Sequence, residues 1–331
     1  MKLTSVCVIG GGAWGTALAQ TLALGGQNVT LWAREPDVVD DIRTRRVNRS
    51  FLPGISLDSH ITATTSLGDA AASDAVLIVA PAQHVRPTSE ALAKHLRPET
   101  PVVMCAKGIE QATGKLMGDV ISETLPTAQF AVLSGPSFAS DVARGLPAAL
   151  TLACRNETIG RGLAAALSSR QMRLYWTSDV VGAVLGGAVK NVLAIAAGIV
   201  EGRGLGASAH AAIVTRGFAE LRRFGEALGA RPETLLGLSG LGDLVLTCGS
   251  PQSRNMSLGR SLGEGKSLSN ILGARTAVTE GVYTAAAVVR LAREKGIEMP
   301  IAEAVHAIIE GRASVEDAIT ALMLRPLKAE D

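Results

Sequence analysis

The chain has 331 residues. A single hydrophobic core rarely extends over so many residues, so the length predicts two domains. Hydrophobic residues make up 47% of the sequence, and the formal net charge is only +2. This charge lacks the basic excess of proteins that bind nucleic acid or anionic membranes, so we expect neither as a partner.

The N-terminal segment is expected to form a β-α-β unit. Residues 3–9 are rich in β-branched side chains and predict a strand, after which an alanine- and leucine-rich helix should run to about Leu24. Residues 28–33 predict the second strand of the unit.

The turn that opens the first helix carries the pattern Gly10-x-Gly12-x-x-Gly15. In a dinucleotide-binding turn the first glycine makes the tight bend, the second lets the backbone approach the pyrophosphate, and the third allows close packing of helix and strand. The helix N-terminus then faces the phosphates. We expect a dinucleotide here, and an ordinary glycine-rich turn is the alternative.

The second strand ends at Ala33, and Arg34 and Glu35 follow. Sites for NAD usually place an acidic residue here against the ribose 2′-hydroxyl, whereas a guanidinium can pair with the 2′-phosphate of NADP. Because both residues are present, NADP(H) and NAD(H) both remain open as cofactors. A solvated loop arginine is the alternative.

Four more apolar segments predict strands, with helical stretches between several of them. They are 75–80, 101–105, 130–133 and 149–153. Continuous apolar strands that alternate with helices indicate a mostly parallel sheet covered on both faces. Near 178 the pattern changes, and only helices and glycine-rich connections are expected beyond it. We therefore predict a doubly wound Rossmann α/β domain over 1–177 and an all-α domain over 178–331.

Two of these strands lead into loops with polar side chains. Lys107 follows the strand at 101–105, and the segment 134–138 (SGPSF) follows the next one. Ligands of doubly wound sheets bind outside the carboxyl ends of the strands, so both loops should open onto the nicotinamide crevice. Ordinary surface loops carry the same residue types, and that alternative stays open.

Residues 180–200 are almost all apolar or small, and by length they could span a bilayer. Lys190 stands at their centre beside Asn191, and a lysine in the middle of a membrane helix is costly. Gly186 and Gly187, within one turn of the lysine, leave room for a ligand. We expect no membrane span but a buried helix, where burial tunes Lys190 for proton transfer. A structural ion pair is the alternative.

The segment 240–247 (GLGDLVLT) places Asp243 and Thr247 four residues apart, so they share a face if it is helical. Asp243 is then the natural partner of Lys190. The segment 253–255 (SRN) precedes a helical stretch, and arginine with free backbone amides at a helix start favours a phosphate. A plain N-cap with an exposed arginine is the alternative.

The four cysteines show no C-x-x-C spacing, which suggests free thiols in a reducing compartment. The five histidines show no metal-binding spacing, so no metal site is expected. The first residues run directly into a strand rather than a signal peptide. These features predict a cytoplasmic protein.

Together, the motifs resemble those of bacterial-type glycerol-3-phosphate dehydrogenases that use NAD(P). They occur in the right order over nearly the whole chain. The segments are GGGAWGTALA (10–19), AKGIE (106–110), SGPSFA (134–139), GGAVKNVLAIAAG (186–198), GLGDLVLTC (240–248), QSRN (252–255) and VTEGVYTA (278–285). The resemblance implies an oxidoreductase that interconverts dihydroxyacetone phosphate and sn-glycerol 3-phosphate by hydride transfer and so supplies phospholipid synthesis.

The resemblance also implies that Lys190 is the proton donor or acceptor. Lys107, Asp243 and Asn191 are expected to assist it. With the glycine turn included, the expected cofactor contacts are Gly10, Gly12, Ala13, Trp14, Gly15, Arg34, Lys107, Ala139, Arg254, Val278 and Glu280. With the helical spacing included, the expected substrate contacts are Lys107, Gly135, Ser137, Lys190, Asp243, Thr247, Ser253, Arg254 and Asn255.

Two other functions stay open. A β-hydroxyacid or 6-phosphogluconate-type dehydrogenase shares the two-domain plan, but it needs a carboxylate site that the motifs after 240 fit poorly. A non-catalytic dinucleotide sensor would not need Lys190, Asp243 and Arg254 together. The expected partner is a small-molecule substrate. The sequence does not determine the oligomeric state, and a homodimer is one option.

Overall fold

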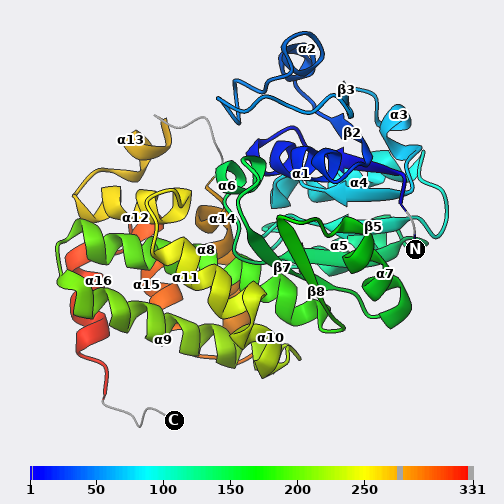
Figure 1. Cartoon of the computed structure of the whole chain (residues 1–331). Helices are drawn as coiled ribbons and strands as arrows, with labels where there is room; N and C mark the ends of the chain where they lie inside the picture. The colour runs from blue at the N-terminus through cyan, green and yellow to red at the C-terminus, as the bar shows by residue number, and fades with distance from the viewer. Residues whose placement is uncertain (2, 274–278, 327–331) are drawn as a thin grey trace.

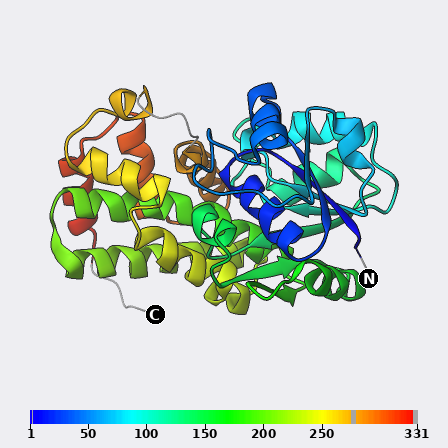
Figure 2. The same cartoon turned by 45° about the horizontal axis from the view of Figure 1, so that its top comes forward.

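The structure is a computed structural model that describes residues 1, 3–273 and 279–326. It consists of an eight-stranded sheet with helices on both faces and, beside it, a bundle of helices (Figures 1 and 2). The strands are β1 (Ser5–Ile9), β2 (Asn28–Trp32), β3 (Ile61–Thr64), β4 (Ala75–Ile78), β5 (Pro101–Met104), β6 (Gln129–Ser134), β7 (Ala148–Ala153) and β8 (Met172–Thr177). This arrangement confirms the predicted fold class.

The strand order in the sheet is β3-β2-β1-β4-β5-β6-β7-β8. All neighbouring strands are parallel except β6 and β7, which pair antiparallel. The chain moves outward from β1 to β3 and then returns to place β4 on the other side of β1. This reversal makes the carboxyl ends of β1 and β4 the switch point, where doubly wound sheets bind their ligands.

Both faces of the sheet are covered by helices that bury its apolar side chains. The elements between the strands are α1 (Ala13–Leu24), α2 (Pro36–Arg45), α3 (Leu67–Ala71), a 3-10 turn (Ala82–His84), α4 (Val85–Ala93), α5 (Met117–Thr124), α6 (Ala139–Ala143) and α7 (Glu157–Leu167). On one face α1, α2 and α7 pack against residues such as Val8 and Leu31. On the other, α3, α4 and α5 pack against residues such as Val76 and Met104.

The strands β3 and β8 carry no signal that predicts them from the sequence. β3 has only four residues (ITAT), too few for a clear pattern. β8 is the last strand of the sheet, and its residues alternate between buried Met172 and exposed Arg173 and Tyr175. A short strand and a half-exposed edge strand both lack the continuous apolar run by which the others were recognised.

The second part of the molecule is helical throughout its described residues. Its elements are α8 (Val180–Gly202), α9 (Gly206–Ala227), α10 (Pro232–Leu236), a single π turn (Leu238–Gly242), α11 (Asp243–Cys248), α12 (Arg254–Gly263), α13 (Leu268–Gly273), α14 (Glu280–Glu294), α15 (Pro300–Ile309) and α16 (Val315–Met323). By length and composition α8 could cross a membrane, but its apolar window is entirely buried inside the protein. It is the central helix of this part of the structure.

Glycines let α8 and α12 cross with their backbones in contact. A Cβ on Gly198 would collide with the Met256 carbonyl oxygen, and one on Gly259 would collide with that of Ile195. The helices therefore approach more closely than larger side chains would permit. This packing fixes the start of α12 against the middle of α8, where Lys190 lies.

Candidate active site

The buried carboxylate of Asp243 is shared by two lysines from different parts of the fold. The Nζ atom of Lys190, on α8, lies 2.5 Å from its Oδ1, and the Nζ atom of Lys107, in the loop after β5, lies 2.6 Å from its Oδ2. The Asp243 side chain is 0% exposed, against 8% for Lys190 and 18% for Lys107. The structure therefore contains the expected pair of Lys190 and Asp243 and adds Lys107 as a second partner.

A close backbone contact places Asp243 beside Lys190. A Cβ on Gly186 would collide with the Ser239 carbonyl in the π turn, so α8 and the turn meet without side chains between them. Asp243 begins α11 directly after that turn. Single π turns interrupt regular helices, frequently at functional sites, and this one directs the Asp243 carboxylate toward α8.

Burial changes the proton affinity of Lys190. Desolvation lowers its pKa to about 8, the Asp243 carboxylate opposes that shift, and the Lys107 ammonium adds to it. The Lys190 ammonium also donates to Oγ1 of Thr247 at 2.8 Å. Asp243 and Thr247 thus lie on one face of α11, and Lys190 has a pKa close to the range in which a proton donor works near neutral pH.

Asn191, the neighbour of Lys190, belongs to a hydrogen-bonded chain across three helices. The side-chain amide of Asn255, on α12, donates to Oδ1 of Asn191 at 2.9 Å. Oδ1 of Asn255 accepts from the backbone N–H of Gly281, on α14, at 3.0 Å. The two asparagines therefore hold α8, α12 and α14 in register beside the Lys190 site.

The loop after β6 meets Lys107. The Lys107 ammonium donates to the carbonyl oxygen of Gly135 at 3.0 Å, and the Ser137 hydroxyl donates to the same oxygen at 3.2 Å. Gly135 has a φ of +146° and packs against the backbone of Leu150. The backbone conformation and the contact both favour glycine at this position.

The start of α12 carries Ser253 and Arg254. The Ser253 hydroxyl accepts the N–H of Met256 at 3.2 Å and so caps the helix. Arg254 reaches solvent, but enough protein surrounds its guanidinium for desolvation to lower its pKa, an effect that the Glu280 carboxylate opposes. Arg254 on α12 and Glu280 on α14 thus lie near enough to each other to interact electrostatically at the edge of the site.

The glycine turn after β1 packs closely at one glycine and leaves open space at another. A Cβ on Gly15 would collide with the carbonyl oxygen of Gly10, whereas one on Gly12 would meet no atom within 4 Å. Gly12 is the N-cap of α1 and has no side chain to satisfy the first amides of that helix. Ala13, Trp14 and Ala139 pack on one small apolar cluster beside the turn.

Two expected cofactor contacts lie elsewhere or outside the described part of the chain. Arg34 follows β2, its side chain is 74% exposed, and its guanidinium pairs with the Glu35 carboxylate at 3.0 Å. Arg34 does not belong to the group formed by Lys190, Lys107 and Asp243. This is expected of a residue that would contact the adenosine end of a dinucleotide. Val278 falls outside the described residues.

Several buried polar atoms near these loops have no hydrogen-bond partner among the residues that the structure describes. They include Trp14 Nε1, Ser134 Oγ, Glu280 Oε2 and Thr284 Oγ1. Buried polar groups are nearly always paired in native proteins, so these four atoms are candidates for hydrogen bonds to a ligand. Burial raises the pKa of Glu280, and its other carboxylate oxygen accepts the N–H of Ala82 at 3.2 Å.

Ser134 and Thr284 were not selected from the sequence. Ser134 ends β6, and a Cβ on Gly187 would lie 2.8 Å from its hydroxyl and 3.2 Å from the side chain of Lys107. Its place in the quoted segment SGPSF (134–138) was the sequence feature that could have identified it as a site residue. Thr284 lies one turn beyond Glu280, and its place in the quoted segment VTEGVYTA (278–285) was the corresponding signal.

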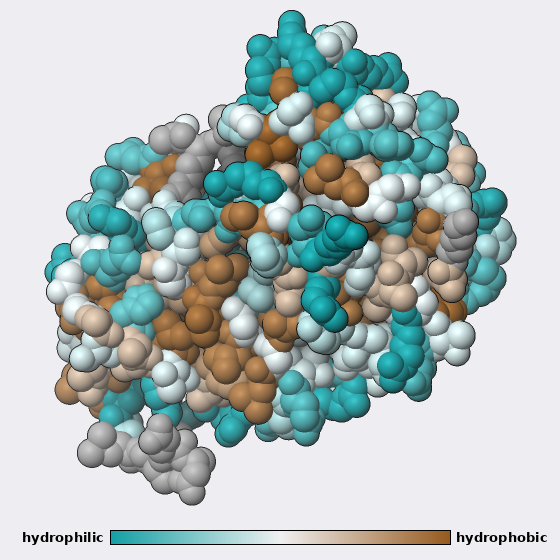
Figure 3. Space-filling model, viewed as in Figure 1, coloured by the Kyte–Doolittle hydropathy of each residue, from teal (hydrophilic) through white to brown (hydrophobic). Residues whose placement is uncertain are grey.

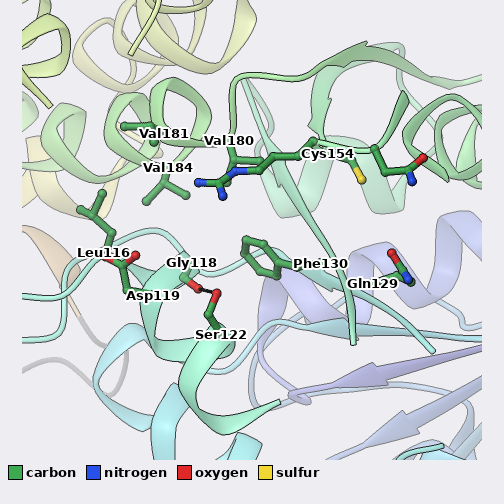
Figure 4. Close-up of a pocket in the computed structure, with 12 residues that line it drawn as sticks. Leu116, Gly118, Asp119, Ser122, Gln129, Phe130, Cys154, Val180, Val181 and Val184 are labelled. Atoms are coloured by element: carbon green, nitrogen blue, oxygen red, sulfur yellow. Dashed lines mark hydrogen bonds between the residues drawn. The ribbon is translucent and has the colours of Figure 1, made fainter. Parts of the chain in front are cut away.

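A cavity of about 250 Å³ lies away from this site, between α5, the start of α8 and the amino end of β6 (Figure 4). It is lined by apolar residues such as Phe130 and Val184 and by polar ones such as Asp119 and Ser122. None of the candidate site residues lines it. Within residues 1, 3–273 and 279–326, no three His, Cys, Asp or Glu side chains are grouped to hold a metal ion.

Known proteins match the chain along most of its length. Residues 5–160 match the family model for the NAD-dependent glycerol-3-phosphate dehydrogenase N-terminus, and residues 179–320 match that for the C-terminus. The glycerol-3-phosphate dehydrogenase (NAD(P)+) of Parvibaculum lavamentivorans is 58% identical over 98% of both chains, and that of Caulobacter vibrioides is 57% identical over 100% of both. The crystal structure of glycerol-3-phosphate dehydrogenase from Coxiella burnetii is similar with a TM-score of 0.93 and 37% identity, over 97% of this chain and 99% of that one.

Proposed function

Because the chain belongs to the NAD-dependent glycerol-3-phosphate dehydrogenase family, we propose that it interconverts dihydroxyacetone phosphate and sn-glycerol 3-phosphate with a nicotinamide dinucleotide. By this reaction it supplies glycerol 3-phosphate for phospholipid synthesis. The observation that carries the proposal is the buried carboxylate of Asp243 between Lys190 and Lys107. A carbonyl reduction needs both a proton donor and positive charge near the oxygen that becomes negative, and this cluster supplies both.

The residues around the glycine turn fit a dinucleotide. The open space at Gly12 and the uncapped N-terminus of α1 suit a pyrophosphate. Two further atoms have no hydrogen-bond partner among the described residues and could bond other parts of the dinucleotide. Trp14 Nε1 offers a donor, and Glu280 Oε2 offers an acceptor. A bound nicotinamide supplies the hydride chemistry that no side chain of the protein can provide.

Lys190 holds the proton for the reaction. Its ammonium is the general acid toward the C2 oxygen during reduction, and its neutral amine is the general base toward the C2 hydroxyl during oxidation. Asp243 and Thr247 orient Lys190, and Asp243 stabilises its charged form. Lys107, fixed between Asp243 and the Gly135 carbonyl, keeps a second positive charge at the same place, and Asn191 assists Lys190 from the neighbouring position.

The start of α12 binds the substrate phosphate. Arg254 contributes a guanidinium and Asn255 an amide, and Ser253 is the N-cap whose hydroxyl accepts the N–H of Met256 at the start of the helix. Gly135 and Ser137 line the same crevice from the sheet side. Arg254 also contacts the cofactor in this proposal, together with Val278, Glu280, Ala139, Lys107 and the glycine turn.

Either dinucleotide suits the turn, and Arg34 supports NADP(H) as the better cofactor. Its guanidinium is exposed at the end of β2, where the 2′-position of the adenosine ribose would lie. The paired Glu35 carboxylate keeps NAD(H) acceptable, because a carboxylate at this place can accept the 2′-hydroxyl.

The two rival functions are less well supported. A hydroxyacid dehydrogenase of the 6-phosphogluconate type needs a cationic pocket for a carboxylate, whereas Lys190 and Lys107 already share the Asp243 carboxylate. A sensor without catalysis has no need of a buried lysine with a lowered pKa. An assay of dihydroxyacetone phosphate against 3-hydroxy acids, with NADH and NADPH, separates these three functions. Turnover of a 3-hydroxy acid alone, or of neither substrate, would reject the proposal.

We also propose a homodimer. Apolar side chains gather over α9, α10 and α11 (Figure 3), and Leu236 and Val245 are exposed there. Exposed apolar surface of this kind commonly marks a protein interface, and a second copy of the chain is the simplest occupant. Light scattering of the protein and of Val245→Asp tests this, and a monomeric wild type would contradict it.

We further propose a cytoplasmic location and a domain boundary between 177 and 178.

A further inference from the structure

Asn48 links the chain between α2 and β3 to the glycine turn. The residue is 1% exposed. Its Nδ2 atom donates to the carbonyl oxygen of Gly11 and to Oγ1 of Thr16, both at 2.8 Å. Its Oδ1 atom accepts the N–H of Phe51 at 3.1 Å. One buried amide therefore joins two segments that are 32 to 37 residues apart in the sequence.

The contact with Gly11 fixes one particular peptide group. The described residues contain no cis peptide bond, and in a trans peptide the C=O and N–H point in opposite directions. When the Gly11 carbonyl faces Asn48, the N–H of Gly12 must face away from it. No described residue accepts a hydrogen bond from that N–H, and the space beside Gly12 is open.

The peptide needs such a restraint because it joins two glycines. Without Cβ atoms, both residues have access to many backbone conformations, so this peptide group can rotate more easily than others. Thr16 contributes little by itself, since its hydroxyl lies 3.4 Å from the same carbonyl oxygen. The strongest side-chain restraint on the Gly11 carbonyl is therefore the amide of Asn48.

We propose that Asn48 is a positioning residue for cofactor binding, which orients the peptide between Gly11 and Gly12 so that the Gly12 N–H meets the dinucleotide pyrophosphate. This rests on the proposed function of the turn as a dinucleotide site. Asn48 touches neither substrate nor reacting atoms in this role. Its loss therefore weakens cofactor binding but leaves the chemical step unchanged once the cofactor is bound.

The substitution Asn48→Asp isolates the donor. The aspartate keeps an oxygen for the Phe51 N–H but cannot donate to Gly11 while ionised. We expect the Kd and KM for NADPH to rise roughly ten- to hundredfold, as for the loss of a buried hydrogen bond, with kcat at saturating NADPH within about twofold of wild type. The KM for dihydroxyacetone phosphate should not change.

Gln20→Ala is the matched control. Gln20 is buried on α1 and ties that helix to the same connecting segment through Ser56 and Asp58, two turns away from the glycine turn. Its loss should lower the melting temperature without changing the Kd for NADPH. A merely structural Asn48 would behave like Gln20, with a lower melting temperature and an unchanged Kd.

The outcomes separate this inference from the proposed function. A wild type that binds neither NADPH nor NADH would overturn both. A wild type that binds NADPH, together with an Asn48→Asp variant of equal affinity, would overturn the role of Asn48 alone. If Asn48→Asp yields no folded protein, Asn48→Ala, whose side chain has no donor, is measured in the same way, and an unchanged Kd in that variant overturns the role equally.

Discussion

The Nζ atom of Lys190 and the Oδ1 atom of Asp243 lie 2.5 Å apart, although 53 residues separate them in the sequence. The second oxygen of the same carboxylate holds Lys107 at 2.6 Å. Removing one partner of a buried ion pair usually leaves an uncompensated charge. Here Asp243 would keep Lys107 if Lys190 were replaced, so the catalytic role of Lys190 can be tested without leaving the carboxylate unpaired.

The pH dependence of the reaction should differ between its two directions. Because burial lowers the pKa of Lys190 to about 8, its ammonium is lost as the pH rises through that value. The kcat/KM for reduction of dihydroxyacetone phosphate should therefore fall above about pH 8, and that for oxidation of glycerol 3-phosphate should rise up to the same pH. Profiles between pH 6 and 10 test this. Profiles with no inflection near pH 8 in either direction would exclude Lys190 as the titrating group.

Arg34 should govern the choice between NADPH and NADH. Arg34→Ala is expected to lower the ratio of kcat/KM for NADPH to that for NADH by roughly ten- to hundredfold, the effect of losing a charge-assisted hydrogen bond. Glu35→Ala should raise the ratio, because it frees the guanidinium that Glu35 now holds. Steady-state kinetics with both cofactors on both variants decide the matter. An unchanged ratio in Arg34→Ala would make Arg34 a surface residue only.

Arg254→Ala should chiefly impair recognition of the phosphate. The expected loss in kcat/KM for dihydroxyacetone phosphate is on the order of 2–4 kcal/mol, and activity on unphosphorylated dihydroxyacetone should change much less. Arg260→Ala is the control, because Arg260 lies on the same helix and pairs with Glu201 and Glu264 at the surface. Equal losses on both substrates would point to a structural role for Arg254.

Glu220 should make folding stability depend on pH. It is buried on α9, where its carboxylate accepts the N–H groups of Ile301 and Ala302 at the start of α15. Desolvation raises its pKa from 4.5 to about 7, and these hydrogen bonds oppose that shift. Between these two values the folded protein holds a proton that the unfolded chain has lost, so stability falls as the pH rises, by on the order of 3 kcal/mol.

The substitution Glu220→Gln should remove this component of the pH dependence. Urea midpoints measured from pH 5 to pH 8 should fall less steeply in the variant than in the wild type, because the other titrating groups cancel in the comparison. Glu226→Gln, at an exposed position on the same helix, should follow the wild type. Parallel curves for wild type and Glu220→Gln would show that Glu220 does not titrate differently on folding.

The sequence predicted those parts of the site that local spacing encodes. The glycine turn is a pattern of six residues between a strand and a helix, and Lys190 is conspicuous on an apolar helix. The pairing of Lys190 with Asp243 followed from charge alone. Together with the resemblance, these features were sufficient for the fold class and the family.

Other features depend on contacts that no local pattern records. Lys107 was expected at the crevice, but its bond to Asp243 depends on how the loop after β5 meets α11. Asn48 lies in an ordinary polar segment, and only the packing of that segment on the turn reveals its bond to Gly11. The antiparallel pairing of β6 and β7 was also missed, because the direction of a buried strand leaves no mark on its composition.

The most direct test of the proposed mechanism is kcat of Lys190→Met, measured together with its melting temperature and NADPH affinity. Methionine roughly conserves shape, and Lys107 still compensates Asp243, so we expect a folded protein with wild-type affinity for NADPH. Turnover should fall by at least the ~10²–10⁴-fold typical of losing a positioned proton donor. Lys190→Arg should be similarly slow, because an arginine keeps the charge but cannot give up its proton. A folded, cofactor-binding Lys190→Met protein with kcat near that of the wild type would contradict the assignment.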